Sequence, residues 1–299
     1  MNALVIYNKK AGGGKAAKFS EKIQELFKKN NINIDIKFTE YFQHAVKIVG
    51  QANLNDYDSI ITVGGDGTFF ETLNGYYQNE NKKKDINFGV LPIGTGNSLS
   101  KDVYQNDYSL ERYIEIIAQA KTKAFDIAKY KNNGTEMYYA NTLGFGFVSD
   151  VVLTANNFKY LGKFAYTIGV LHKTILLSTH DMKLVIDGNT FDMNNVFVSI
   201  SNTRYTGGNY LIAPNASVSD GKLDLIIVNK LSRYNLLKTF PKIFTGEHIN
   251  SKYVETMQAE NIRIETSKPK ILSPDGELFG NTPLNIECLK GAINIITDL

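Results

Sequence analysis

The residues that most clearly could do chemistry in this chain are five consecutive ones: Gly64, Gly65, Asp66, Gly67 and Thr68. They follow an apolar run at 59–63 and precede a helical pattern, which predicts a buried strand, a glycine turn and a helix. Glycines let the backbone approach a bulky anion, and the first amides of the helix point at that anion. Because a carboxylate repels phosphate unless a cation lies between them, Asp66 predicts a Mg²⁺-nucleotide.

The helix after this turn also has a predicted start. Thr68 and Glu71 have the spacing of a capping box, so we expect the helix to begin at Thr68. Glycine turns between a strand and a helix also occur as plain tight connections in parallel sheets. One short motif leaves that structural alternative open.

A second glycine turn favours the functional interpretation. Residues 91–98 read Leu-Pro-Ile-Gly-Thr-Gly-Asn-Ser, so Gly94 is followed by the hydroxyl of Thr95 and the amide of Asn97. Two such turns after neighbouring strands make nucleotide binding the better interpretation than a structural role alone.

The loop at 8–15 is a weaker candidate. It falls short of a P-loop, because Lys9 replaces the first glycine and Ala16 replaces the Ser or Thr that would hold Mg²⁺. It is either a phosphate-binding loop that offers backbone amides and Lys15, or a flexible turn. Thr39 follows the second expected strand, where its hydroxyl would either reach a nucleotide or start a helix.

The first 120 or so residues alternate strands and helices, which predicts a parallel sheet with helices on both faces. In such sheets ligands bind beyond the carboxyl ends of the strands, where all of these loops lie. Strands are expected at 4–7, 32–38, 59–63 and 86–91, and helices at 15–30, 44–50, 68–78 and 109–121.

Beyond about residue 125 short alternating runs predict a mainly antiparallel β domain. Asp187-Gly188 is a hairpin signal. Two helical inserts are expected, near 158–178 and at 232–244, the second broken at Pro241. The boundary is expected near 121–126, and the cleft between the two domains is the expected site. Strands are expected at 138–141, 183–186, 196–200, 222–228, 262–265, 270–272 and 293–296.

Composition limits the partners. A formal net charge of +3 gives no reason to propose nucleic acid, and the run 82–84 of three lysines is a solvated loop. The single cysteine, Cys288, excludes an intrachain disulfide and a cysteine cluster for zinc. The first residues are typical of a strand rather than a signal peptide, and the apolar stretch 164–178 is too short to span a bilayer. We therefore expect a cytoplasmic protein, with a homodimer left open.

The ordered motifs resemble the diacylglycerol kinase catalytic-domain family, which includes bacterial lipid kinases and sphingosine kinases. The resemblance covers nearly the whole chain and lies in 8–15, Thr39, 64–68 with Glu71 and Asn74, 91–98, 141–146, Gly207-Gly208, Ala213-Pro214, 220–224 and 275–277. It implies an α/β plus β fold: a parallel α/β domain at 1–123, similar to NAD kinases and diacylglycerol kinases, and a mainly antiparallel β-sandwich at 124–299 that binds the lipid.

The resemblance also implies an ATP- and Mg²⁺-dependent kinase that transfers the γ-phosphoryl group to a lipid hydroxyl. The nucleotide would be bound by Asn8, Lys15, Thr39, Gly64, Gly65, Asp66, Gly67, Thr68, Glu71, Asn74, Gly94, Thr95 and Asn97, with Mg²⁺ near Asp66. A basic and aromatic segment at 157–164 suits peripheral membrane contact, and a core helix with an exposed basic face explains it equally well.

Two acidic turns complete the expected site. Asp275 or Glu277 is the expected general base, and the resemblance does not decide which; a plain β-turn at 274–276 is the alternative. Asp220, with backbone carbonyls near Ser217 and Lys222, resembles a structural Mg²⁺ site, or is an ordinary Asp-Gly turn.

Departures from the family pattern affect the first loop and the substrate. Lys9 and Ala11 replace a usual proline and serine, which leaves the pose of that loop open. Ser98 stands where many bacterial members carry aspartate, which leaves open the lipid and one Mg²⁺ contact. A NAD kinase and a nucleotide-sensing module without catalysis are the alternatives. A NAD kinase should carry another acidic glycine motif in its β domain. A nucleotide-sensing module would not need the acidic residues at 275–277.

Overall fold

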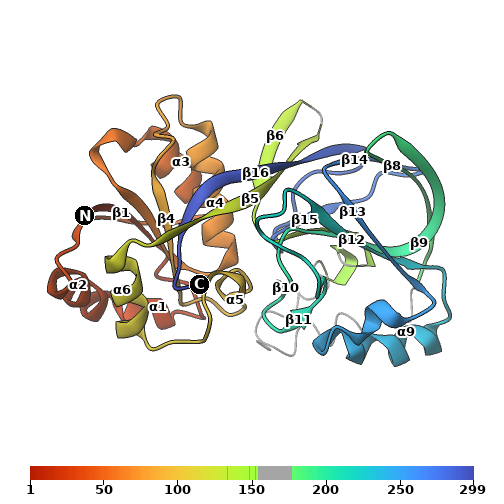
Figure 1. Cartoon of the computed structure of the whole chain (residues 1–299), viewed down its shortest axis with the longest axis horizontal. Coiled ribbons are helices and arrows are strands. Elements are labelled where there is room, and N and C mark those ends of the chain that lie inside the picture. Colours follow the sequence, from red (N-terminus) through yellow and green to blue (C-terminus); the bar gives the residue numbers. More distant parts are fainter. Residues whose placement is uncertain (133, 148, 152, 154–176) are drawn as a thin grey trace. The chain divides into compact units, whose positions relative to one another are not determined.

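The computed structural model describes residues 1–132, 134–147, 149–151, 153 and 177–299. The chain forms two compact units, coloured along the sequence in Figure 1. Unit 1 comprises Met1–Ile127 with Lys290–Leu299, and unit 2 comprises Ala128–Leu289. Strands β5 (Thr122–Asn132) and β16 (Leu284–Ile296) each contribute residues to both units.

Unit 1 is a parallel α/β sheet. Its elements before β5 are β1 (Asn2–Tyr7), α1 (Lys15–Lys18), α2 (Ser20–Lys29), β2 (Asn33–Phe38), α3 (His44–Gln51), η1 (Leu54–Asp56), β3 (Ser59–Gly64), α4 (Asp66–Gln78), β4 (Asn87–Pro92), α5 (Ser100–Val103) and α6 (Leu110–Gln119). The strand order is β2-β1-β3-β4, and the end of β16 pairs in parallel with β4. Apolar side chains on β1 and β3 are buried, which explains their continuous hydrophobic runs.

The predicted strands and helices of unit 1 are confirmed, with two differences. The single helix expected at 15–30 is two helices, because Phe19 between them has non-helical dihedral angles of −99° and 0°. The helix after β3 begins at Asp66, with Gly65 as its N-cap, so the predicted start at Thr68 is wrong. Thr68 lies inside the helix, where the capping-box interpretation does not apply.

Unit 2 is built from antiparallel pairs. Its elements are β6 (Thr135–Tyr139), β7 (Thr142–Gly146), β8 (His180–Ile186), β9 (Asn189–Ser201), β10 (Tyr205–Thr206), β11 (Tyr210–Leu211), β12 (Leu223–Asn229), α9 (Arg233–Thr239), η3 (Phe240–Phe244), η4 (Glu247–Asn250), β13 (Val254–Ala259), β14 (Asn261–Thr266) and β15 (Leu272–Pro274). The order β13-β12-β9-β8-β14-β16 forms the main sheet, and β7 pairs with both β9 and β15. The predicted fold class, a parallel α/β domain and an antiparallel β domain, is confirmed.

Two local predictions in unit 2 are confirmed. Asp187 and Gly188 both have positive φ, 45° and 88°, and form the two-residue turn between β8 and β9. Pro241 lies in η3, directly after α9 has ended at Thr239, because proline cannot continue the hydrogen-bonded helix.

Two predictions on the middle of the chain fall outside this description. The helical insert near 158–178 and the basic, aromatic segment at 157–164 lie outside the described residues, apart from 177 and 178. Of the helices in the described ranges, none is long and apolar enough to cross a membrane.

Candidate active site

The first glycine turn places a helix N-terminus at the end of β3. Gly65 is the N-cap of α4 and has no side chain, so it leaves the first amides of the helix without a side-chain acceptor. A Cβ on Gly64 would lie 2.5 Å from the Thr68 hydroxyl oxygen, so only glycine fits this close approach. The helix is 13 residues long. The dipole and the first amides of such a helix favour an anion at this end.

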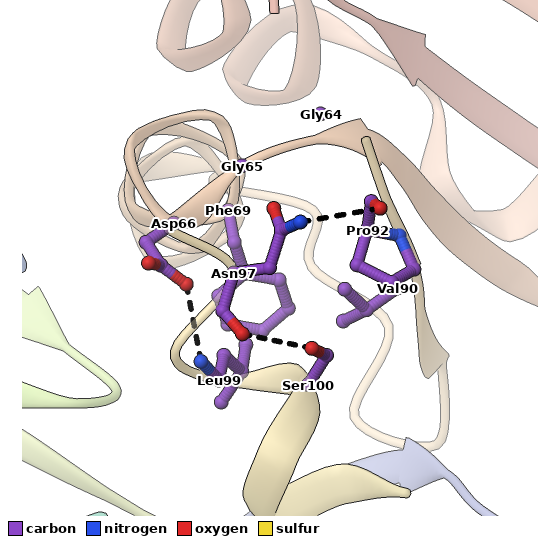
Figure 2. Close-up of a pocket in the computed structure, with 9 residues that line it drawn as sticks. All are labelled: Gly64, Gly65, Asp66, Phe69, Val90, Pro92, Asn97, Leu99 and Ser100. Carbon is purple, nitrogen blue, oxygen red and sulfur yellow. Dashed lines mark hydrogen bonds between the residues drawn. The ribbon is translucent and has the colours of Figure 1, made fainter. Parts of the chain in front are cut away.

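Asp66 connects this turn to the loop after β4. Its Oδ2 accepts a hydrogen bond from the Ser98 N–H at 2.9 Å. Its Oδ1 accepts from the Leu99 N–H at 3.1 Å, the bond drawn in Figure 2. Burial raises the pKa of the Asp66 carboxyl, and these hydrogen bonds oppose the rise. The carboxylate therefore holds the second loop in place and would gain further stabilisation from a nearby cation.

The second glycine turn is closed by Asn97. The Asn97 Oδ1 accepts from the Gly94 N–H at 2.8 Å, and the Asn97 amide donates to the Gly94 carbonyl at 3.1 Å. The same amide donates to the Pro92 carbonyl at 3.3 Å (Figure 2). A Cβ on Gly94 would lie 2.4 Å from the Gly65 Cα. The two glycine turns are thus packed backbone against backbone, which no larger residue at Gly94 would permit.

The loop after β1 joins the same edge of the sheet. The Asn8 side-chain amide donates to the Thr68 hydroxyl at 3.1 Å, and a Cβ on Gly12 would lie 2.5 Å from the Ile93 carbonyl oxygen. Lys9 is one of the departures from the family pattern, and its Nζ lies 3.8 Å from the centroid of the Phe38 ring, over its face. The loops after β1, β3 and β4 are therefore brought together, as expected for carboxyl ends of parallel strands.

The remaining sites predicted in unit 1 lie less centrally. Thr39 follows β2, with its N–H donating to the Tyr7 carbonyl at 2.9 Å, and Lys15 is exposed at the first position of α1. The Glu71 carboxylate accepts from the N–H groups of Gln43 and Ala45 at 2.9 and 3.2 Å, so it caps α3.

Asn74 lies deeper in α4 and is also engaged within the protein. It is only 1% exposed, and its side-chain amide donates to the Phe70 carbonyl at 2.8 Å. Glu71 thus joins α4 to the start of α3, while this Asn74 hydrogen bond stays within α4 itself.

The acidic turn of unit 2 follows β15. Asp275 and Gly276 have positive φ, 46° and 84°, and the Glu277 N–H donates to the Pro274 carbonyl at 2.8 Å. The segment is therefore the tight turn that the structural alternative predicts. The Asp275 carboxylate also accepts three backbone hydrogen bonds, from Ala140 at 3.0 Å, Asn141 at 2.9 Å and Thr142 at 3.0 Å.

Asp220 lies in a separate turn of unit 2. Its Oδ1 accepts from the Lys222 N–H at 3.0 Å, and the residue is exposed. Burial, more than the nearby charge of Asp220, raises the pKa of Asp224 to about 6. Within the ranges given for the structure, no group of three or more His, Cys, Asp or Glu side chains is arranged to hold a metal ion.

This geometry coincides with two family matches. Residues 2–130 match the diacylglycerol kinase catalytic domain, and residues 141–297 match the YegS C-terminal NAD kinase beta sandwich-like domain. The chain belongs to the diacylglycerol kinase catalytic-domain family. It is a kinase of this lipid-kinase family, and such enzymes phosphorylate a hydroxyl group.

Individual relatives match most of this chain at low identity. The chain is 26% identical to a diacylglycerol kinase of Bacillus subtilis, over 94% of this chain and 91% of the relative. It is 26% identical to sphingosine kinase 1 of Arabidopsis thaliana, over 97% of this chain and 71% of the relative. A crystal structure of a diacylglycerol kinase from Bacillus anthracis superposes with a TM-score of 0.81 at 27% identity, covering 99% and 97% of the two chains.

In this lipid kinase a buried polar network lies behind the acidic turn, and sequence reasoning missed it. The Thr142 hydroxyl donates to the Ser201 hydroxyl at 3.2 Å, and the Asn202 amide donates to the Ala140 carbonyl at 2.8 Å. The Thr203 hydroxyl donates to the Asn141 Oδ1 at 3.3 Å. These bonds fix the same backbone that Asp275 holds. The only sequence signal is the polar run that ends the β9 strand.

Proposed function

We propose that this chain is an ATP- and Mg²⁺-dependent lipid kinase that transfers the γ-phosphoryl group to the hydroxyl of a diacylglycerol-like or sphingoid-like lipid. The observation that carries the proposal is the α4 N-terminus, which has no side-chain cap and packs against a second glycine turn through Gly65 and Gly94. Such an arrangement suits a polyphosphate, because it offers many amide donors and no side chain that blocks approach.

The residues that we assign to ATP, the phosphate donor, lie in unit 1. We assign phosphate contacts to the backbone at 64–68 and to the turn that contains Gly94, Thr95 and Asn97. Asn8 supports Thr68 through its hydrogen bond, and Lys15 and Thr39 lie at the same edge of the sheet. Glu71 supports the nucleotide site indirectly, because its carboxylate joins α4 to the start of α3, and Asn74 lies on the same helix.

The fit for Mg²⁺ rests on Asp66. Its buried carboxylate has a raised pKa, which means that a cation beside it would favour the ionised form. Both oxygens already accept an amide hydrogen, so a Mg²⁺ ion that keeps most of its water ligands suits this carboxylate best. When bound, the ion neutralises charge on the transferred phosphoryl group. Asp220, with carbonyls of Ser217 and Lys222, is the structural Mg²⁺ site that we propose for unit 2.

The residue that we assign to the lipid, the phosphoryl acceptor, lies in unit 2. We assign the general base to Glu277. The Asp275 oxygens already accept three backbone hydrogens, which leaves few lone pairs for a substrate proton. Glu277 is held at the end of the same turn through its backbone N–H. Its carboxylate takes the proton of the lipid hydroxyl, the hydroxyl oxygen forms the new bond to the γ-phosphorus, and ADP leaves with the electrons of the broken bond.

Incubation of the protein with γ-labelled ATP, Mg²⁺ and separate acceptors tests this proposal. We expect label in diacylglycerol or a sphingoid base and none in NAD. Omission of Mg²⁺ should abolish the transfer. Label in NAD alone would favour a NAD kinase, and ATP binding without transfer to any lipid would favour a nucleotide sensor. Either result would contradict the proposal.

A further inference from the structure

An outer segment of unit 2 presents large apolar side chains to solvent. Tyr234 and Leu237 on α9 are 72% and 44% exposed, and Phe244 at the end of η3 is 51% exposed. Tyr234 and Leu237 are three residues apart and therefore share one side of the helix. Figure 1 shows α9 on the outside of unit 2, next to the strands.

This segment is firmly folded, so the exposure is built into the structure. The Ser232 hydroxyl caps α9 by accepting from the Asn235 N–H at 3.2 Å, and the Asn235 side chain donates to the Tyr253 hydroxyl at 2.8 Å. Leu236 is buried beside Val196 and Leu231, on the opposite side from the exposed residues. The Phe244 ring lies 5.0 Å from the Tyr210 ring, which anchors η3.

The same segment is strongly basic. Between Asp224 and Glu247 the sequence holds no acidic residue and four basic ones, which are Lys230, Arg233, Lys238 and Lys242. All four are exposed. Long basic side chains next to exposed aromatic and aliphatic groups are typical of a surface that lies at a membrane interface.

We propose that α9 and η3, together with Lys230 ahead of α9, form a docking surface for an anionic lipid bilayer, called here the α9 face. Tyr234, Leu237 and Phe244 would enter the headgroup region while the four cations pair with lipid phosphates. The inference rests on the proposed function in one respect, since a lipid acceptor must be taken from a membrane.

The charge argues against a second copy of the chain as the occupant. Most homodimers are twofold symmetric, so the α9 face would meet its own copy. Four cations would then oppose four identical cations with no acidic residue in the segment to compensate. An anionic bilayer removes this repulsion and also accepts the apolar side chains.

Vesicle flotation of the full chain without nucleotide tests the proposal. Wild type should bind vesicles that contain phosphatidylglycerol more tightly than pure phosphatidylcholine vesicles. Lys238→Gln with Lys242→Gln should weaken binding to the anionic vesicles by roughly tenfold or more, since each cation contributes on the order of 1 kcal/mol. Leu237→Ser with Phe244→Ser should weaken it to a similar degree, roughly tenfold.

Matched controls come from elsewhere in the chain. Lys82→Gln with Lys84→Gln removes the same charge from unit 1, and Phe191→Ser removes an apolar side chain that is 39% exposed on β9. Both controls should bind vesicles as wild type does. Equal losses in the controls and in the α9 variants, or no loss in the α9 variants, would overturn the proposal.

Two further measurements separate the possible failures. With a short-chain diacylglycerol dissolved as monomers, the α9 variants should keep wild-type kcat and KM, while their activity on vesicle-bound lipid falls. Loss of activity on the monomeric lipid would overturn the docking role. Light scattering that shows a dimer in wild type and a monomer in the α9 variants would assign the face to self-association instead. Vesicle binding without any lipid phosphorylation would contradict the proposed function alone.

Discussion

Asp66 of unit 1 and Asp275 of unit 2 both stand in glycine turns, and both carboxylates accept backbone hydrogen bonds. Asp66 accepts two, from a loop that follows a neighbouring parallel strand, and it begins a helix that has no side-chain cap. Asp275 accepts three, from the segment at 140–142, and its own backbone has positive φ. The Asp66 carboxylate joins the two glycine turns of unit 1, and the Asp275 carboxylate joins its own turn to the segment at 140–142.

Under these assignments, an acidic residue in a motif need not be the residue that does the chemistry. In unit 1 the chemistry is assigned to the amides that Asp66 helps to place and to a cation beside it. In unit 2 we assign it to Glu277, two residues beyond the braced aspartate. Single substitutions in each turn separate bracing from chemistry.

The largest expected effect on stability comes from separating the two turns of unit 1. Gly94→Ala places a Cβ 2.4 Å from the Gly65 Cα, which the backbone relieves only by moving apart. We expect a loss of about 3 kcal/mol in the free energy of unfolding and loss of measurable ATP binding, by denaturant titration and calorimetry. Gly50→Ala is the control, because its Cβ would meet only the Gly75 carbonyl oxygen at 3.7 Å. Wild-type ATP affinity in Gly94→Ala would contradict the packing argument.

The second effect concerns the three backbone hydrogen bonds that the Asp275 carboxylate accepts in unit 2. Asp275→Asn replaces one acceptor oxygen by a donor amide, which then faces a backbone N–H. We expect the free energy of unfolding to fall by about 1–3 kcal/mol, measured by urea titration. Glu277→Gln serves as the matched control, because the three backbone hydrogens go to Asp275, and it should lower the free energy of unfolding by less than Asp275→Asn does. Equal stability of the two variants would contradict a structural role that belongs to Asp275 and not to Glu277.

The third effect is a pH dependence at Asp66. Because burial raises its pKa in the folded state, folding favours the protonated carboxyl. Wild type should therefore lose stability relative to Asp66→Asn as pH rises from the unfolded-state pKa through the folded-state pKa. Unfolding titrations at several pH values measure this difference, and added Mg²⁺ should reduce it. Parallel pH profiles for the two proteins would show that no such shift exists.

The smallest effect concerns Glu71. If its carboxylate serves to cap α3, Glu71→Gln should cost about 1 kcal/mol of stability and leave the affinity for ATP within about twofold. Thermal unfolding and calorimetry on the same sample measure both quantities. A tenfold loss of ATP affinity with unchanged stability would contradict the capping role and indicate that Glu71 contacts the nucleotide.

Local patterns predicted much of this fold. The strand, turn and helix around 59–78, the hairpin at Asp187-Gly188 and the break at Pro241 follow from short-range rules of periodicity and backbone conformation. Long-range pairing did not follow from them. The end of β16 joins β4 across some 200 residues of sequence, with Asn294 opposite Asn87, and no local pattern specifies that partner.

In the candidate site, too, local sequence patterns predicted some features, and long-range contacts that they could not predict set the others. Glycine spacing located both turns of unit 1, since glycine is required where Gly65 and Gly94 approach each other. The partners of Asp275 could not be predicted, because they are backbone amides at 140–142, which any sequence would supply. Likewise the start of α4 at Asp66 depends on packing around Gly65 rather than on the spacing of Thr68 and Glu71.

The most direct test of the central claim is the rate of phosphoryl transfer from ATP to diacylglycerol by wild type, Glu277→Gln and Asp275→Asn. We expect Glu277→Gln to keep its ATP affinity and to lose roughly 10²–10⁴-fold in kcat. Asp275→Asn should lose stability and retain more activity than Glu277→Gln. A Glu277→Gln enzyme with near wild-type kcat, or a stable Asp275→Asn enzyme without activity, would contradict the assignment of the base to Glu277.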